Sequence, residues 1–512
     1  MTETIDTVLR TGTDGATALL APGRPPLTYA ALRELVAATV RSLNVAGAGR
    51  NDRVAIVLDN GPEMAACFLA CAAGTTSAPL NPGYRADEFE FYLSDLNAKL
   101  LIVERTSASP AVAAAEKLGV RIVDLVVDDG MAAGEFRLEP RGGASPHPSP
   151  LPASGERGYS QPGDIGMVLH TSGTTSRPKI VPLSVANLCA SARNIRTSLA
   201  LGANDVGLNI MPLFHIHGLI AGVLAPLSAG SAVYCTPGFN ALKFFTWMDD
   251  AKPTWYTAVP TMHQAIVSRA KNNAAVIARH PLRFMRSSSS SMPPQVIVEL
   301  EAAFGAPLIE AYGMTEATHQ MASNPLPPAV RKPGSVGLPA GPEIAIMGGD
   351  GELLAHGLTG EIVIRGANVT AGYENNPTAN ADGFRDGWFR TGDQGTQDGD
   401  GYLTITGRLK EIINRGGEKI SPREIDEILM DHPAVAQVVC FGIPHGKLGE
   451  EVGAVVVLKP GGAATDRELQ AFVGARVADY KVPAKILFMD EIPKGATGKL
   501  QRIGLAAKLG LL

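Results

Sequence analysis

Cysteine is scarce in this sequence, and neither charge sign dominates it. The 512 residues include five cysteines, with no C-x-x-C pair, and this excludes a disulfide framework and suits a reducing cytoplasm. Cys67 and Cys71 lie four residues apart in an apolar helical stretch, which favours a buried helix face over a metal pair. The net charge is 45 − 50 = −5, and this argues against a nucleic-acid-binding protein, which usually has a strongly basic domain.

Long hydrophobic runs are also missing. The most apolar stretch, from Gly218 to Tyr234, is interrupted by Pro226 and Gly230 and is shorter than the roughly 20 residues that a bilayer requires. The N-terminal residues MTETIDTVLR lack the basic head and apolar run of a signal peptide. We therefore expect a cytoplasmic protein without a membrane partner, either a monomer or a homodimer.

The apolar residues that are present indicate several domains. They make up 45% of the chain, and single hydrophobic cores stop growing near 250–300 residues. Helical stretches, such as one capped by Thr28 and one starting at Pro62, alternate with apolar strands such as Val54–Leu58 and Leu100–Val103. This α/β alternation predicts mostly parallel sheets covered by helices.

The pattern changes twice along the chain. Short alternating strands from Gly334 to Gly366 predict a small antiparallel, barrel-like part. After Gly407, two capping boxes, Ser421–Glu424 and Thr465–Glu468, predict helices of a small mobile α+β domain. We predict an N-terminal domain over residues 1–408 and a C-terminal domain over 409–512.

A Pro-, Gly- and Ser-rich insert interrupts the first domain at about residues 140–163. It has no apolar period, and we interpret it as a mobile surface loop without a function of its own.

The segment His170–Lys179 (HTSGTTSRPK) carries the first chemical signal. It follows a predicted strand at Asp164–Leu169 and precedes a helix capped near Ser184. Hydroxyls and backbone N–H groups at such a turn form an anion cradle, to which a lysine adds a charge. A Ser/Thr-rich connector is the alternative, and the segment is not a Walker loop, because GxxxxGK[ST] is absent.

This segment resembles the diagnostic motif of the adenylate-forming enzymes, which comprise acyl-CoA synthetases, luciferases and adenylation domains. Further motifs of that family recur in the right order over most of the chain: Met211–His215, Tyr312–Glu316, Gly372-Tyr373, Trp388–Asp393, Gly407–Glu411, Gly417–Pro422 and Pro493–Lys499. The resemblance implies an ATP-dependent acid–thiol ligase, which forms acyl-AMP with release of pyrophosphate and then passes the acyl group to coenzyme A. Its co-substrates are ATP and coenzyme A, and its metal is Mg²⁺.

The resemblance also implies site residues. The ATP-binding residues would be Thr171, Ser172, Gly173, Thr174, Thr175, Lys179, Glu310, Ala311, Tyr312, Thr315, Asp393, Arg408 and Lys499. Within this set, Thr315 would contact the α-phosphate and Tyr312 would stack on adenine. Asp393 would accept hydrogen bonds from the ribose hydroxyls. The catalytic residues would be Lys499, Thr315, Glu316 and His215, and Glu316 would be the Mg²⁺ ligand. Lys410 would be the hinge, and Gly416, Gly417 and Glu418 would shape the coenzyme A tunnel.

Two positions depart from the family pattern, because Ser176 and Ile180 stand where glycine is usual. A β-branched residue rarely adopts φ > 0, so Ile180 predicts a rearranged loop exit.

Serine and histidine near these motifs suggest a small, polar acid. The predicted acid-pocket residues are His215, Ser289, Ser290 and His319, with His217 and the rest of the Ser287–Ser291 run as further candidates. A second carboxylate would need such donors, because a buried unpaired charge is costly. Four stretches resemble oxalate–CoA ligases: Glu310–His319, Ser323–Pro327, Lys332–Gly337 and Ile413–Pro422. Oxalate is therefore the first substrate that we predict. Malonate or another short acid is second, and a fatty or aryl acid is third.

Two other functions remain open at this stage. The chain could be an adenylation subunit that loads a carrier protein, although no carrier domain is visible. It could also be an inactive nucleotide-binding protein, although Glu316, Asp393, Arg408 and Lys499 are all present.

Overall fold

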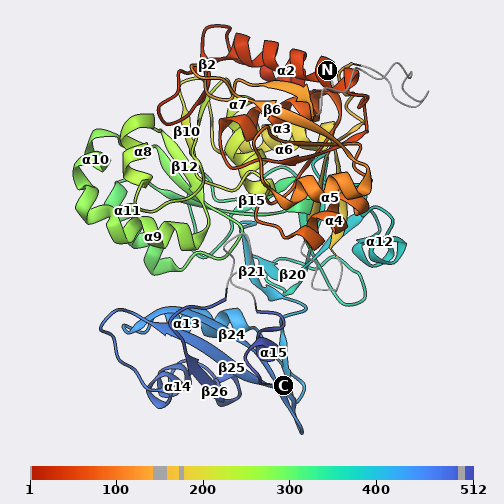
Figure 1. The fold of residues 1–512 in the computed structure, drawn as a ribbon. Helices are drawn as coiled ribbons and strands as arrows, with labels where there is room; N and C mark the ends of the chain where they lie inside the picture. The colour runs from red at the N-terminus through yellow and green to blue at the C-terminus, as the bar shows by residue number, and fades with distance from the viewer. Residues whose placement is uncertain (1–2, 142–157, 172–177, 494–501, 512) are drawn as a thin grey trace.

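A large lobe and a small lobe make up the molecule (Figure 1). The computed structural model describes residues 3–141, 158–171, 178–493 and 502–511, so most of the predicted insert at 140–163 lies outside the described residues. Across these ranges, no helix has both the length and the apolar character needed to span a bilayer.

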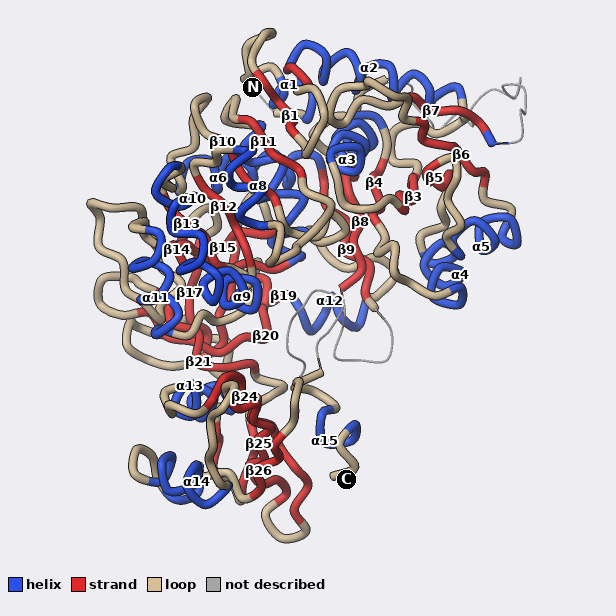
Figure 2. The backbone as a smooth tube through the Cα atoms, turned by 60° about the vertical axis from the view of Figure 1, so that its left-hand side comes forward, coloured by secondary structure: helices blue, strands red, loops and turns tan. Residues whose placement is uncertain are grey.

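A seven-stranded sheet forms one half of the large lobe. Its strand order is β7 (Arg137–Pro140), β6 (Arg121–Val126), β5 (Leu100–Glu104), β3 (Arg53–Val57), β4 (Thr76–Pro79), β8 (Ile165–Thr171) and β9 (Lys179–Ser184). The five central strands run parallel, and the two edge strands, β7 and β9, are antiparallel to their neighbours. Figure 2 shows α4 (Ala86–Asp95) and α5 (Pro110–Leu118) side by side next to this sheet.

A nine-stranded sheet forms the other half. Its order is β16 (Leu338–Pro339), β15 (His319–Ser323), β14 (Leu308–Met314), β13 (Phe284–Ser287), β12 (Trp255–Ala258), β10 (Val206–Asn209), β11 (Ala232–Cys235), β1 (Thr17–Leu20) and β2 (Leu27–Thr28). The six strands from β14 to β1 are parallel, so their carboxyl ends lie along the same edge. The predicted helix-covered, mostly parallel sheets are confirmed.

Helix α3 (Pro62–Gly74) lies between these two sheets, with contacts to β3, β4 and β8 on one side and to β11 on the other. Its proline occupies the first turn, where no N–H partner is lost. Cys67 and Cys71 are fully buried on it, so the predicted buried helix face is confirmed.

Other helices of the large lobe pack around the strands and against one another. They are α1 (Ile5–Leu9), α2 (Tyr29–Val45), α6 (Val185–Ser198), α7 (Ala225–Leu227), α8 (Phe244–Ala251), α9 (Pro260–Ala270), α10 (Ala274–Arg279), α11 (Pro294–Phe304) and α12 (Pro377–Gly383), with η2 (His217–Leu224), η3 (Lys271–Asn273) and η4 (Thr315–Ala317). The predicted cap of α2 is present, since the Thr28 hydroxyl accepts from the Ala31 N–H at 3.2 Å.

An antiparallel sheet leads from the large lobe to the small one. It contains β17 (Glu343–Met347), β18 (Gly360–Arg365), β20 (Trp388–Gln397) and β19 (Phe384–Arg385), with β21 (Leu403–Arg408) paired to β20. This confirms the antiparallel part predicted from the alternating pattern.

The small lobe has its own five-stranded sheet and its own core. Its strands are β23 (Glu418–Ile420), β22 (Ile413–Arg415), β25 (Gly449–Leu458), β24 (Val435–His445) and β26 (Lys485–Phe488), and its helices are α13 (Pro422–Met430), α14 (Asp466–Gly474), η5 (Asp479–Lys481) and α15 (Leu505–Lys508). The described chain passes from β21 to β22 around residue 410, and the division into residues 1–408 and 409–512 stays a prediction.

One of the two predicted capping boxes in the small lobe is wrong. Thr465 and Glu468 form theirs at the start of α14. Ser421 does not cap α13: its hydroxyl donates to the Thr406 carbonyl of β21, and Glu424 accepts from Lys481 Nζ at 2.8 Å. Tertiary partners outside the helix therefore replace the local pairing.

Candidate active site

The Ser/Thr-rich segment connects two antiparallel strands. Thr171 ends β8 and pairs with Lys179, the first residue of β9, while Ser172, Gly173, Thr174 and Thr175 lie outside the described residues. The predicted helix α6 does begin after Ser184, which forms a capping box with Asn187, but β9 separates it from the segment.

The loop exit that Ile180 was expected to rearrange lies outside the described residues, so that rearrangement stays a prediction. Ile180 itself has strand backbone in β9, is buried beneath α4 and α5 in their core, and pairs with His170. A β-branched side chain suits that position.

Tyr373 joins two of the predicted phosphate-site residues. Its ring lies 4.2 Å from Lys179 Nζ, and its hydroxyl donates to Glu316 Oε1 at 2.8 Å. Burial and the Glu316 carboxylate raise the pKa of Tyr373, so the phenol keeps its proton and remains a donor. A cation, a phenol and a carboxylate are thereby brought together from β9, the loop before α12, and η4.

The chain around Glu316 has an unusual backbone. Thr318 and His319 both have positive φ, at 49° and 92°, directly after the 3₁₀ turn η4. A Cβ on Gly313 would lie 1.8 Å from the His319 carbonyl oxygen, so only glycine fits opposite this bend. Strained backbone of this kind is concentrated at functional sites.

Glu316 fits a metal that arrives with a nucleotide. Its carboxylate is a hard oxygen ligand, and the Tyr373 hydroxyl occupies only one of its two oxygens. Mg²⁺ is usually held by one or two carboxylates, and phosphates and waters complete its coordination. Groups of three or more metal-binding side chains do not occur among the described residues.

Tyr312, Asp393 and Arg408 also meet. The Tyr312 hydroxyl donates to Asp393 Oδ2, and Arg408 Nε donates to Asp393 Oδ1 at 3.0 Å. Asp393 and Arg408 are opposite each other in the β20–β21 ladder, which fixes their separation. The two neighbours hold Asp393 as an oriented acceptor, the chemistry predicted for a ribose contact.

Glu310 and Ala311 precede Tyr312 on β14, and both are buried. The Glu310 carboxylate accepts from the Gly334 N–H at 3.1 Å, and burial raises its pKa to about 7.

The raised pKa predicts how Glu310 affects stability. In the unfolded chain its pKa is near 4.5, so between pH 4.5 and about 7 unfolding releases a proton that the folded state retains. Stability therefore falls as pH rises through this window. Glu310→Gln keeps an acceptor for Gly334 but cannot ionise. We expect this variant to match the wild type near pH 4.5 and to exceed it by roughly 3 kcal/mol above pH 7.

Urea unfolding of both proteins at pH 5 and pH 8 measures this difference. A constant difference across the two pH values would contradict the prediction.

The structure brings most of the acid-pocket candidates together. His217 is fully buried at the start of the π-helix η2, and its ring stacks on that of His319 with centroids 4.7 Å apart. Its Nδ1 lies 3.1 Å from Ser289 Oγ. His215 is adjacent, because its Nδ1 accepts from the His217 N–H at 3.3 Å. Single turns of π-helix occur often at functional sites.

Ser290 is placed differently. It is exposed and, with Ser291, lines a cavity of about 180 Å³ between the lobes, whose opposite wall includes Arg423 and Asp426 of α13. Ser289 itself has φ of 75° at the bend between the buried strand β13 and this cavity. Of the predicted acid-pocket residues, Ser290 alone lines this space between the lobes, and Ser289 precedes it in the chain.

The residues predicted for the hinge and the coenzyme A tunnel are found on the small-lobe side. Lys410 is exposed in the turn after β21, where the Leu409 N–H donates to the Gly392 carbonyl. Gly416 and Gly417 form the two-residue turn between β22 and β23, with φ of 62° and 102°, and Glu418 begins β23. Tight hairpins need glycine at such positions. Lys499 lies outside the described residues.

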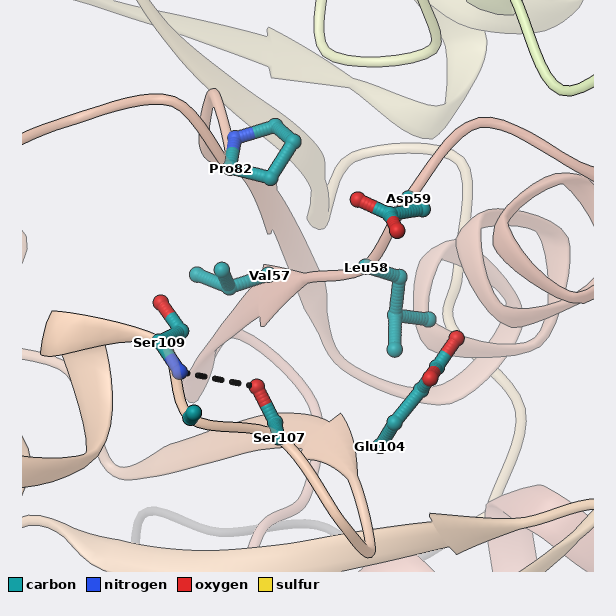
Figure 3. A pocket seen from close by; sticks show the side chains of 8 residues that line it. Val57, Leu58, Asp59, Pro82, Glu104, Ser107 and Ser109 are labelled. Carbon is teal, nitrogen blue, oxygen red and sulfur yellow. Dashed lines mark hydrogen bonds between the residues drawn. The ribbon is translucent and has the colours of Figure 1, made fainter.

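Another cavity, of about 220 Å³, lies at the carboxyl ends of β3 and β5 (Figure 3). Asp59 and Glu104 line it, and partial burial together with neighbouring carboxylates raises the pKa of Glu104. Such negative charge disfavours a polyphosphate. This cavity is therefore not the predicted nucleotide site.

Sequence reasoning missed or underrated three residues. Tyr373 stood in a recognised motif without a role, and His217 was only one alternative among several. Arg286 was overlooked, although a charged residue within the apolar strand Phe284–Ser287 was the available signal. It is fully buried and donates from Nη1 toward His217 Nε2 at 3.3 Å.

Comparisons with known proteins identify the family of this chain. The model of the "AMP-binding enzyme" family matches residues 10–374, and that of the "AMP-binding enzyme C-terminal domain" matches residues 424–499. The oxalate–CoA ligase of Arabidopsis thaliana is 46% identical over 95% of this chain and 94% of its own length, and that of Saccharomyces cerevisiae is 41% identical over 88% and 86%. The crystal structure of ATP-bound MatB from Rhodopseudomonas palustris superposes with a TM-score of 0.86 at 27% identity, covering 99% of both chains. The chain belongs to the AMP-binding enzyme family.

Proposed function

We propose that this protein activates oxalate with ATP and transfers the oxalyl group to coenzyme A. As a member of its family, it is an AMP-forming acyl-CoA ligase. In the first step a carboxylate oxygen attacks the α-phosphorus, the bond to the β-phosphate breaks, and pyrophosphate leaves. In the second step the sulfur of coenzyme A attacks the acyl carbon, the thiol proton is lost, and AMP leaves.

The difficulty of the first step is electrostatic, because an anion attacks a polyanion. In the proposed assignment, Lys179 and the hydroxyl residues Thr171, Ser172, Thr174 and Thr175 hold the outer phosphates, with Gly173 allowing close backbone approach. Thr315 contacts the α-phosphate, and Lys499 bridges the carboxylate and the phosphate. Mg²⁺ held by Glu316 would neutralise phosphate charge.

The nucleoside has its own proposed contacts. Asp393, held by Tyr312 and Arg408, would accept from the ribose hydroxyls, and Glu310, Ala311 and the Tyr312 ring would line the adenine. Because the phenol of Tyr312 already donates to Asp393, one side chain would connect the base and sugar contacts.

Two arrangements of the small lobe are part of the proposal. Rotation about Lys410 would exchange the Lys499 segment for the Gly416-Gly417-Glu418 turn next to the acid. His215, beside His217, would separate the acid and thiol sites. Gating by domain motion of this kind is common in enzymes.

The observation that carries the choice of acid is the buried polar cluster of His217, Ser289 and His319 beside Arg286. A fatty or aryl acid would bring apolar surface against these buried polar side chains, which is costly. The relatives named oxalate–CoA ligase support the same choice.

Acid-dependent AMP formation tests the proposal. Oxalate, malonate, acetate, octanoate and coumarate would each be incubated with ATP, Mg²⁺ and coenzyme A. We expect kcat/KM to be highest for oxalate, by about tenfold or more over the monoacids. A site built to hydrogen-bond a polar group of the substrate rejects analogues that lack this group. A higher value for malonate or any other acid would overturn the assignment to oxalate. Replacing coenzyme A by a phosphopantetheinyl carrier protein distinguishes the carrier-loading alternative.

A further inference from the structure

Arg286 is a buried cation without an acidic partner. Its side chain is fully buried at the end of β13, and its hydrogen-bond partners are His217 Nε2 at 3.3 Å, Thr257 Oγ1 at 3.3 Å and Gln320 Oε1 at 3.2 Å. Burial lowers its pKa to about 9, which still leaves the guanidinium charged at neutral pH. Within the described ranges, no carboxylate forms an ion pair with it.

Several polar groups at and next to this cation have no hydrogen-bond partner among the described residues. They are Arg286 Nε and the hydroxyls of Ser287 and Ser288, all of which are buried. Most buried polar groups in proteins are paired, and a buried charge is costly unless it is compensated. The large lobe therefore keeps an excess of positive charge and donors at one strand end.

The hydrogen bonds give this cluster a direction. A guanidinium can only donate, and Thr257 Oγ1, which accepts from Arg286 Nη1 at 3.3 Å, lies 2.7 Å from His217 Nε2. In the arrangement that satisfies all three groups, His217 Nε2 accepts from Arg286 and from the Thr257 hydroxyl, and the ring proton is on Nδ1. Nδ1–H then donates to Ser289 Oγ at 3.1 Å. Because that oxygen already accepts, the Ser289 hydroxyl is free to direct its own hydrogen toward an anion.

We propose that Arg286 is a positioning residue that selects acids carrying a second anionic group, by orienting His217 and Ser289 and by placing a positive charge behind them. This inference rests on the proposed function and extends it from oxalate to the means of its selection. Arg286 would act on the acid through His217 and Ser289, because its side chain is fully buried and contacts His217, which in turn contacts Ser289.

Paired substrates separate this role from simple packing. Oxalate and oxamate have nearly the same shape, but oxamate replaces the second carboxylate with a neutral amide. We expect Arg286→Met to lower kcat/KM for oxalate at least about tenfold more than kcat/KM for oxamate, measured by pyrophosphate release. Arg286→Lys retains a charge and should recover part of the preference for oxalate. Equal losses on both acids would show a packing role and overturn the inference.

Two further measurements distinguish failure of this inference from failure of the proposed function and from misfolding of the variant. Failure of the wild type to activate oxalate would overturn the proposed function itself, whatever the variants do. If Arg286→Met does not fold, His217→Phe interrupts the same chain while retaining a ring to stack on His319. An unchanged ratio of oxalate to oxamate activity in that variant would contradict the role of Arg286, and a reduced ratio would support it.

Discussion

A Lys499→Ala variant is expected to lose acid-dependent pyrophosphate release by a factor of about 10²–10³ while it folds and binds ATP like the wild type. The expected magnitude is that of removing one preorganised charge donor from a transition state. The lysine would be charged at neutral pH. It would contact the attacking carboxylate oxygen and the α-phosphate only while the adenylate forms. Pyrophosphate release, ATP binding and thermal unfolding would be measured on the same preparation.

A half-reaction provides the control. Freshly prepared acyl-AMP, supplied with coenzyme A, bypasses adenylation. Lys499→Ala should form acyl-CoA from it at close to the wild-type rate, because in the proposed mechanism the second step would use the other arrangement of the small lobe. Normal pyrophosphate release by the variant would rule out the assigned role.

A Glu316→Gln variant is expected to lose about 10²-fold in adenylation rate and to need more Mg²⁺ for half-maximal activity. The amide is a weaker ligand for a hard cation and carries no charge to balance it. It can still accept from the Tyr373 hydroxyl, so the local fold should persist. The measurement is pyrophosphate release titrated with Mg²⁺ at saturating ATP.

Tyr373→Phe is the matched control for Glu316→Gln. It removes the hydroxyl bonded to Glu316 but leaves the carboxylate and the ring under Lys179. We expect a loss of less than tenfold and little change in Mg²⁺ dependence, since one neutral hydrogen bond contributes about 1 kcal/mol. An equal loss in both variants would show that Glu316 acts through packing rather than through the metal.

Local signals predicted much of the fold. Helix α2 follows its cap at Thr28, and α3 begins at Pro62, because these features act within one turn of chain. The parallel sheets followed from apolar strands separated by helices. Ser421 shows the limit of such reasoning, because its hydroxyl is bonded to Thr406, a contact between elements that local sequence does not encode.

The site was predictable in composition more than in arrangement. The ordered motifs identified Tyr312, Glu316 and Asp393, and the structure shows how the first and third are joined. The partners of His217 come from β12, β13 and β15, which only the folded sheet brings together. The charged residue within the apolar strand at Arg286 was a signal for an unusual position, but it did not say which side chains it would meet.

The hydrogen bonds between the lobes bear on how easily the small lobe could change its orientation. Arg423 Nη1 and the Ser421 hydroxyl donate to the carbonyls of Ile405 and Thr406, and Gln295 Nε2 donates to that of Met430. Each is a side chain reaching a backbone oxygen, so water can take its place on either surface when the lobes separate. In the proposed reorientation the lobes would exchange bonds of similar strength, and the equilibrium between the two arrangements would respond to small changes in bound ligand.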